Sequence, residues 1–169
     1  VCETIGGEVR LMDYYENHGQ GLDHYIAWLD ENKYRDYTHI LPHDVQVREL
    51  QTGKSRYEFL TDAGLNIDIA PKSGVEDGIM AVRKMLTNCY FNKETTKFGV
   101  ECLRNYRRVF NDKLNVYQEK PLHDWSSHCA DAFRYLALGM NTSGTMVRTN
   151  WTQPFDTTYD GESYKNQYK

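Results

Sequence analysis

The stretch that decides the interpretation of this chain is Leu122-His123-Asp124-Trp125-Ser126-Ser127-His128-Cys129-Ala130-Asp131-Ala132-Phe133-Arg134-Tyr135-Leu136. It opens with polar residues and then becomes strongly apolar. Asp124, Ser126 and Ser127 are candidate N-caps, because a short side-chain oxygen can accept hydrogen bonds from the free amides of a first helical turn. Apolar residues then recur every three or four positions through Met140. This periodicity predicts a helix with one buried face.

His128 and Asp131 lie three positions apart in this predicted helix. They are therefore neighbours on one face, near the positively polarised end of the helix. A carboxylate with an imidazole one turn before it can bind a metal ion or transfer protons. A solvated first turn that merely contains both residue types has the same spacing, and the spacing alone favours that simpler interpretation.

Residues 123–135, His-Asp-Trp-Ser-Ser-His-Cys-Ala-Asp-Ala-Phe-Arg-Tyr, resemble the C-terminal signature of the nuclease domain of tailed-bacteriophage terminase large subunits. Those proteins package DNA into capsids, and their nuclease domains have an RNase H-like fold that cuts DNA with carboxylate-bound divalent metal ions. The resemblance covers about residues 8–140. Its second motif is Pro42-His43-Asp44, which follows a short apolar strand predicted at residues 38–41.

The resemblance implies a two-metal site for Mg²⁺ or Mn²⁺, since carboxylates are the hard oxygen ligands that these ions prefer. It assigns Asp44 and Asp131 as catalytic metal ligands, which predicts that their carboxylates lie side by side. His128 is expected to orient a ligand, bind the second ion weakly or shuttle a proton. Asp124 and His43 are expected to hold these ligands in position without binding the metal ions themselves.

One part of the family pattern is missing. Nucleases of this type carry a first catalytic aspartate on the central strand, in a Gly-x-Asp-x-Gly-like context, and no such motif occurs here. Asp13 belongs to a different predicted strand, so we interpret it as structural. Two explanations stay open: the chain is a fragment, or the domain is degenerate. Either one predicts a weak or inactive nuclease when residues 1–169 are taken alone.

The remaining patterns predict an α/β protein. A hairpin is expected over residues 1–15, helices at 22–32, 54–64, 75–88 and 95–108, a strand at 65–70, and a small hairpin around Asn111-Asp112. With the resemblance, the expected fold is an RNase H-like mixed sheet flanked by helices and lacking its first strand. Residues 1–140 would form this N-terminally incomplete domain, with Gly139 ending the ordered pattern. Residues 141–169 have the composition of a flexible tail.

The net charge of −4 gives no global signature of nucleic-acid binding. A local phosphate-binding patch is expected at Arg104, Arg107 and Arg108, on one side of the helix predicted at 95–108, although a solvated basic face fits nearly as well. Gly53-Lys54-Ser55 is not a phosphate-binding loop, because Arg48 stands where that motif requires glycine.

The compartment and the partners follow from similar observations. The four cysteines lack paired metal-binding spacing, and no signal peptide or membrane-length apolar run is visible, which predicts a protein of the host cytoplasm with no membrane contact. The expected partner is double-stranded DNA. The resemblance adds an upstream ATPase domain, the small terminase subunit and the portal.

The expected function is that of a divalent-metal-dependent endonuclease domain of a DNA-packaging terminase, which cuts concatemeric duplex DNA by phosphodiester hydrolysis. Two alternatives stay open. One is an RNase H-like nuclease of the resolvase or integrase type. The other is a non-catalytic module that docks on DNA or the capsid, which the incomplete carboxylate set would permit.

Overall fold

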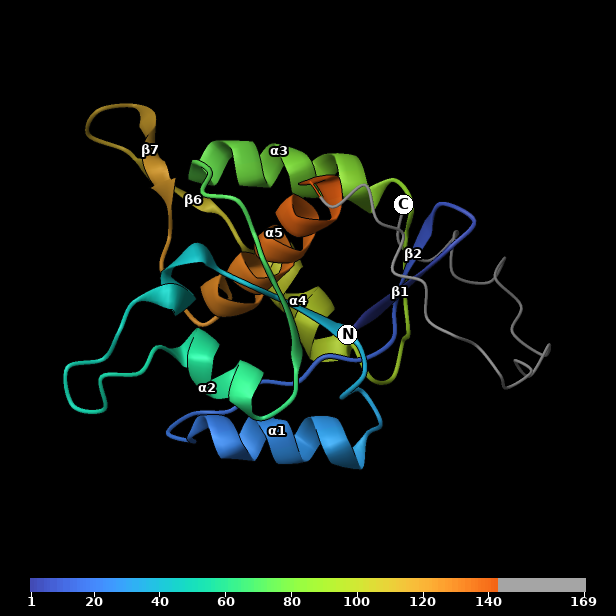
Figure 1. Ribbon diagram of the computed structural model, residues 1–169. Helices are drawn as coiled ribbons and strands as arrows, with labels where there is room; N and C mark the ends of the chain where they lie inside the picture. The colour runs from blue at the N-terminus through green and yellow to red at the C-terminus, as the bar shows by residue number, and fades with distance from the viewer. Residues whose placement is uncertain (143–169) are drawn as a thin grey trace.

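Helices and short strands alternate along residues 1–142, the part of the chain that the computed structural model describes (Figure 1). The strands are β1 (Cys2–Ile5), β2 (Glu8–Leu11), β3 (Thr38–Leu41), β4 (Asn66–Ile69), β5 (Cys89–Phe91), β6 (Arg108–Asn111) and β7 (Val116–Pro121). The α-helices are α1 (Leu22–Glu31), α2 (Arg56–Asp62), α3 (Val75–Leu86), α4 (Lys97–Asn105) and α5 (Ser127–Thr142), and η1 (His43–Gln46) is a short 3₁₀ helix. The fold is therefore mixed α/β, as the sequence predicts.

Within residues 1–142 the strands form small separate sheets with the orders β1-β2-β5, β3-β4 and β6-β7. β1 and β2 form the predicted antiparallel hairpin. Its two-residue turn uses Gly6 and Gly7 at φ 59° and 89°, a left-handed conformation that glycine adopts without steric cost. β2 pairs with β5 in parallel, as β3 does with β4. The sequence patterns did not predict β5, which is only three residues long and follows α3 almost directly.

The predicted helices are present, but two of them end at residues other than those predicted. α2 begins at a capping box, in which the Ser55 side chain accepts a hydrogen bond from the Glu58 amide and the Glu58 carboxylate accepts one from the Ser55 amide. α4 ends at Asn105, so the prediction of a helix reaching residue 108 is wrong. α5 continues to Thr142, so the predicted end of order at Gly139 is also wrong.

α5 is the helix on which several of the other elements pack. It packs against α3, α4 and β3, and its Phe133 joins Val9 and Leu11 of β2 in the buried core. Gly139 lies against Ile40 of β3, where a Cβ atom would come within 2.6 Å of the isoleucine Cγ2. This glycine thus serves close helix–strand packing and does not stop the helix. Most of the predicted tail, residues 143–169, lies outside the described residues.

Candidate functional site

The start of α5 is built by the polar residues of the signature. The Asp124 carboxylate accepts hydrogen bonds from the Ser126 hydroxyl at 2.6 Å and from the Ser126 amide at 2.9 Å. These bonds, first of all that from the hydroxyl, hold the pKa of Asp124 below its usual range, since they favour the charged form. Arg107 lies 3.7 Å from the same carboxylate. In this geometry Asp124 organises the chain that enters α5.

Asp131 lies in the second turn of α5, with its side chain 41% exposed. Its Oδ1 accepts a hydrogen bond from Nη2 of Arg134 at 3.0 Å. Arg134 is almost completely buried, and its aliphatic part packs over Gly78 of α3. The three-residue spacing could have predicted this ion pair from the sequence, because residues three apart on a helix are neighbours. Asp131 therefore neutralises a buried cation as well as facing solvent.

Asp44 belongs to η1, which begins directly after β3 and Pro42. Its carboxylate is 56% exposed and lies 3.6 Å from Nη2 of Arg56, at the start of α2. His43, the residue before it, is also exposed. β3 connects this segment to α5, because the strand that leads into η1 packs on that helix. In Figure 1 the cyan η1 segment and the start of α5 both lie toward the left-hand side of the molecule.

The predicted metal ligands do not form a cluster of three among the described residues. Among residues 1–142, no group of three or more histidine, cysteine, aspartate or glutamate side chains is arranged to hold a metal ion. Asp44, Asp131 and His128 thus do not form such a group, and the structure pairs each carboxylate with an arginine. The shared metal site of Asp44 and Asp131 stays a prediction.

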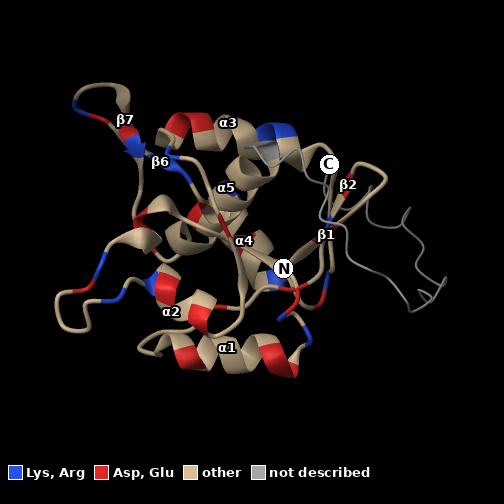
Figure 2. Cartoon of the chain, in the orientation of Figure 1, with Lys and Arg blue, Asp and Glu red and all other residues tan. Residues whose placement is uncertain are grey.

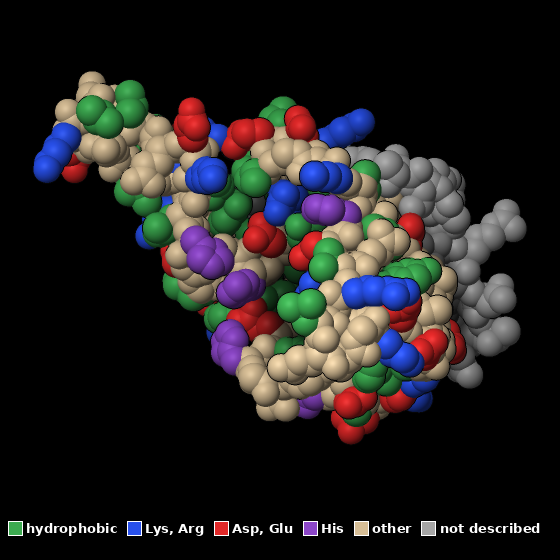
Figure 3. Space-filling model, turned by 60° about the vertical axis from the view of Figure 1, so that its left-hand side comes forward, with side chains coloured by type: hydrophobic (Ala, Val, Ile, Leu, Met, Phe, Trp, Pro, Cys, Tyr) green, Lys and Arg blue, Asp and Glu red, His purple; other side chains and the backbone are tan. Residues whose placement is uncertain are grey.

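The histidines of the signature do come together. The ring centroids of His123 and His128 are 5.5 Å apart in an edge-to-face arrangement, and Nδ1 of His123 lies 2.9 Å from the Ser127 hydroxyl. Figure 3 shows histidine and carboxylate side chains sharing one face of the molecule. Such a face offers both proton-transfer groups and anionic groups to solvent.

The predicted basic cluster is arranged differently from the expectation. Arg104 lies in the last turn of α4, whereas Arg107 and Arg108 follow the helix, so the three do not share a helical face. Arg107 approaches Asp124, and Arg108 forms an ion pair with Glu76 of α3. Figure 2 shows basic residues, coloured blue, along the ribbon of β6 and β7, with acidic residues, coloured red, close by. Partial neutralisation of this kind weakens any attraction for phosphate.

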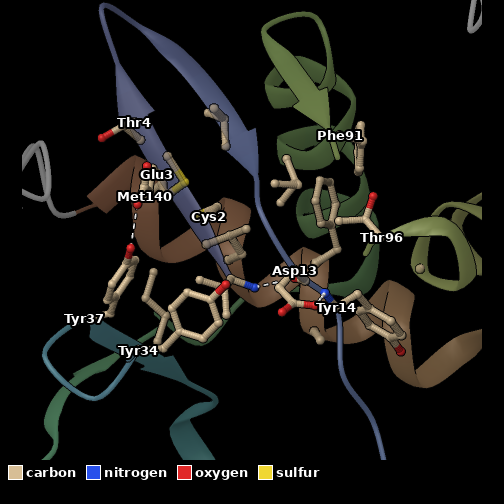
Figure 4. Close-up of a pocket in the computed structure, with 18 of the residues that line it drawn as sticks. Cys2, Glu3, Thr4, Asp13, Tyr14, Tyr34, Tyr37, Phe91, Thr96 and Met140 are labelled. Carbon is tan, nitrogen blue, oxygen red and sulfur yellow. Dashed lines mark hydrogen bonds between the residues drawn. The ribbon is translucent and has the colours of Figure 1, made fainter. Parts of the chain in front are cut away.

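A second feature is a cavity of about 590 Å³ between β1 and β3, over the apolar face of α5. Figure 4 shows Glu3 and Thr4 of β1 on its wall, with Tyr34 and Tyr37 nearby. The Tyr37 hydroxyl donates a hydrogen bond to Oε1 of Glu3 at 2.5 Å. Burial, reinforced by this bond, raises the pKa of Tyr37 well above its ordinary value. No local sequence pattern indicates a cavity, because its walls come from distant segments.

Comparisons of this chain with protein-family models, with curated proteins and with solved structures gave no match. Within residues 1–142, no helix combines the length and the apolar character that a membrane crossing requires.

Proposed function

We propose that this chain is a divalent-metal-dependent DNA endonuclease domain with an RNase H-like fold, of the kind that belongs to phage packaging terminases. The observation that carries the proposal is the joint placement of two motifs. Asp44 lies in η1, which follows the parallel strand β3 and Pro42, and β3 packs on the helix that bears Asp131. The carboxyl ends of parallel strands are where α/β proteins commonly collect catalytic groups.

In the proposed site, Asp44 and Asp131 supply carboxylate oxygens and His128 lies one turn before Asp131. Mg²⁺ or Mn²⁺ would activate a water molecule and neutralise charge on the phosphate. The carboxylates fit such ions in chemistry and in exposure. Two carboxylates are too few to hold such an ion, and the described residues contain no group of three possible ligands. Binding would therefore need at least one further oxygen ligand and release of the carboxylates from Arg56 and Arg134.

The test is a plasmid-cutting assay with Mn²⁺, with Mg²⁺ and with chelator, on a longer parent protein that supplies the first catalytic aspartate of the family pattern, because residues 1–169 alone are expected to cut weakly or not at all. We expect metal-dependent nicking of duplex DNA, and a loss of about 100-fold or more in Asp131→Asn, because the amide is a poor metal ligand. Asn keeps the size of the side chain and can still accept the bond from Arg134. The matched control is Asp62→Asn, which removes an exposed carboxylate at the end of α2 that pairs with Lys54. Equal cutting by Asp131→Asn and the parent chain would exclude Asp131 from the mechanism.

The non-catalytic DNA-docking module is the second candidate, and the absence of a three-ligand group among residues 1–142 favours it. This alternative predicts DNA binding that persists in chelator, weakens steeply with salt and is never followed by cutting. Measuring binding by fluorescence anisotropy beside the plasmid assay separates the two functions.

A further inference from the structure

Two segments project from the part of the molecule that carries Asp44 and the start of α5. One, the loop arm, consists of residues 47–55, which connect η1 to α2. The other, the hairpin arm, consists of residues 107–121, which are Arg107 and the β6-β7 hairpin. Figure 1 shows both arms extending from the left-hand side of the molecule, with η1 and the start of α5 between them in this view.

Each arm is anchored at one of the two motifs that carry the proposed function. The loop arm begins shortly after Asp44 and is closed by a β-bridge between Arg48 and Ser55. The hairpin arm leads directly into the signature at the start of α5, where the Leu122 amide donates a hydrogen bond to the Arg107 carbonyl at 2.8 Å. A partner bound by the arms is therefore held next to these motifs.

Backbone hydrogen bonds give the loop arm a defined shape. The Glu49 amide donates to the Lys54 carbonyl at 3.1 Å, and the Gly53 amide donates to the Glu49 carbonyl at 2.8 Å. Gly53 has a φ of 65°, a left-handed conformation that glycine adopts without steric cost. Leu50 lies within this turn, and its side chain is fully exposed. The loop thus holds an apolar side chain in solvent, where burial in the core does not stabilise it.

The hairpin arm also exposes apolar side chains. Leu114, Val116 and Tyr117 are each more than half exposed, and Phe110 packs edge-to-face on Tyr117 with ring centroids 5.0 Å apart. Among residues 1–142, β6 and β7 pair only with each other. A two-stranded hairpin by itself is marginally stable in water. Contact with a partner would cover these side chains and stabilise the hairpin.

The charge of the arms indicates an anionic partner. The loop arm contains two basic residues and one acidic residue, and the hairpin arm contains four basic residues and two acidic ones. Both arms are therefore net positive in a chain whose net charge is −4. Lys113 and Lys120 of the hairpin arm are exposed. Arg48 and Lys54 pair with carboxylates of α2, but such exposed pairs contribute little to stability and can be exchanged for pairs with phosphate.

We propose that the loop arm and the hairpin arm bind the phosphate backbone of duplex DNA on either side of the candidate site. Their lysines and arginines contact phosphates, and the exposed apolar side chains, including Leu50, contact sugars and bases in a groove. This inference rests on the proposed function, because it identifies the surface that presents DNA to Asp44 and Asp131.

The experiment measures binding of a fluorescein-labelled DNA duplex to residues 1–169 by anisotropy, in chelator and over a series of salt concentrations. Two variants each remove two positive charges from one arm: Arg48→Gln with Lys54→Gln, and Lys113→Gln with Lys120→Gln. Each cation on a phosphate contributes about 0.9 to the slope of log K against log salt concentration, so each variant should reduce that slope by about 1.8.

The matched control, Arg83→Gln with Lys84→Gln, removes the same charge from exposed positions in the last turn of α3 and should keep the parent slope. Equal reductions in all three variants would reveal an effect of net charge alone and would overturn the proposal. An unchanged slope in either arm variant would also overturn it and would assign that arm to a protein partner.

The use of chelator separates this result from the cutting assay. Reduced slopes in both arm variants, together with a longer parent protein that never cuts DNA, would support the arms as a DNA-binding surface and exclude the endonuclease. Cutting by the longer parent with unchanged slopes in the arm variants would support the endonuclease and overturn the role of the arms.

Discussion

Asp131 has a structural role in addition to the metal-binding role that the resemblance assigns to it. It neutralises Arg134, whose guanidinium is almost buried between α5 and α3 and whose Nε has no partner among the described residues. Asp131→Ala should therefore lower the free energy of unfolding by about 1 kcal/mol, because it leaves a buried cation with one bond fewer. Urea unfolding against Asp62→Ala measures the effect. Identical stabilities of the two variants would show that the Arg134 pair contributes nothing.

Asp124 provides a prediction in the acid range. Its folded-state pKa is depressed by the Ser126 hydrogen bonds, so its contribution to stability is present above the unfolded pKa and is lost as pH falls through the folded one. Asp124→Asn should be less stable than the parent chain at pH 7. It should also lose less stability between about pH 4 and pH 2. Urea midpoints across this range check the prediction, and parallel profiles for the two proteins would contradict it.

At the scale of elements, the α5–β3 contact depends on the absence of a side chain at Gly139. Gly139→Ala adds a methyl group that clashes with Ile40. Overpacking costs about 2 kcal/mol, and the better helix propensity of alanine returns at most about 1 kcal/mol, so we expect a net loss of about 1 kcal/mol. In an Ile40→Ala background the same substitution should be neutral or stabilising. A stabilising effect with Ile40 intact would contradict this account of the glycine.

The same contact shows what the sequence could and could not predict. The hairpin within residues 1–15, the helix that starts near residue 54 and the apolar face of α5 are local patterns, and the structure confirms them. Gly139 was interpreted as the end of the ordered pattern, because glycine is unfavourable inside a helix. Its packing against Ile40, which the sequence does not show, explains why it stands there. Arg108 was placed in a basic cluster, although its partner Glu76 lies 32 positions away. Pairing over such distances leaves no local sequence pattern, which is also why the cavity was not foreseen.

At the scale of the whole molecule, the hydrogen bond between Tyr37 and Glu3 links the two sheets across the cavity. Tyr37→Phe removes the donor to Oε1 and leaves a buried carboxylate whose other oxygen already lacks a partner among the described residues. The cost of stranding such a group is about 1–3 kcal/mol, so we expect a loss of stability in that range. The matched control, Tyr117→Phe on the exposed β7 strand, should change the stability by less than about 0.5 kcal/mol.

The double variant Glu3→Gln, Tyr37→Phe separates this link from simple packing. Neutralising Glu3 removes most of the penalty for the missing donor, so the two substitutions together should cost less than the sum of their separate effects. Chemical unfolding of the four proteins gives the coupling energy directly. A coupling near zero would mean that the hydroxyl and the carboxylate contribute independently, and that α5 alone holds the two sheets in place.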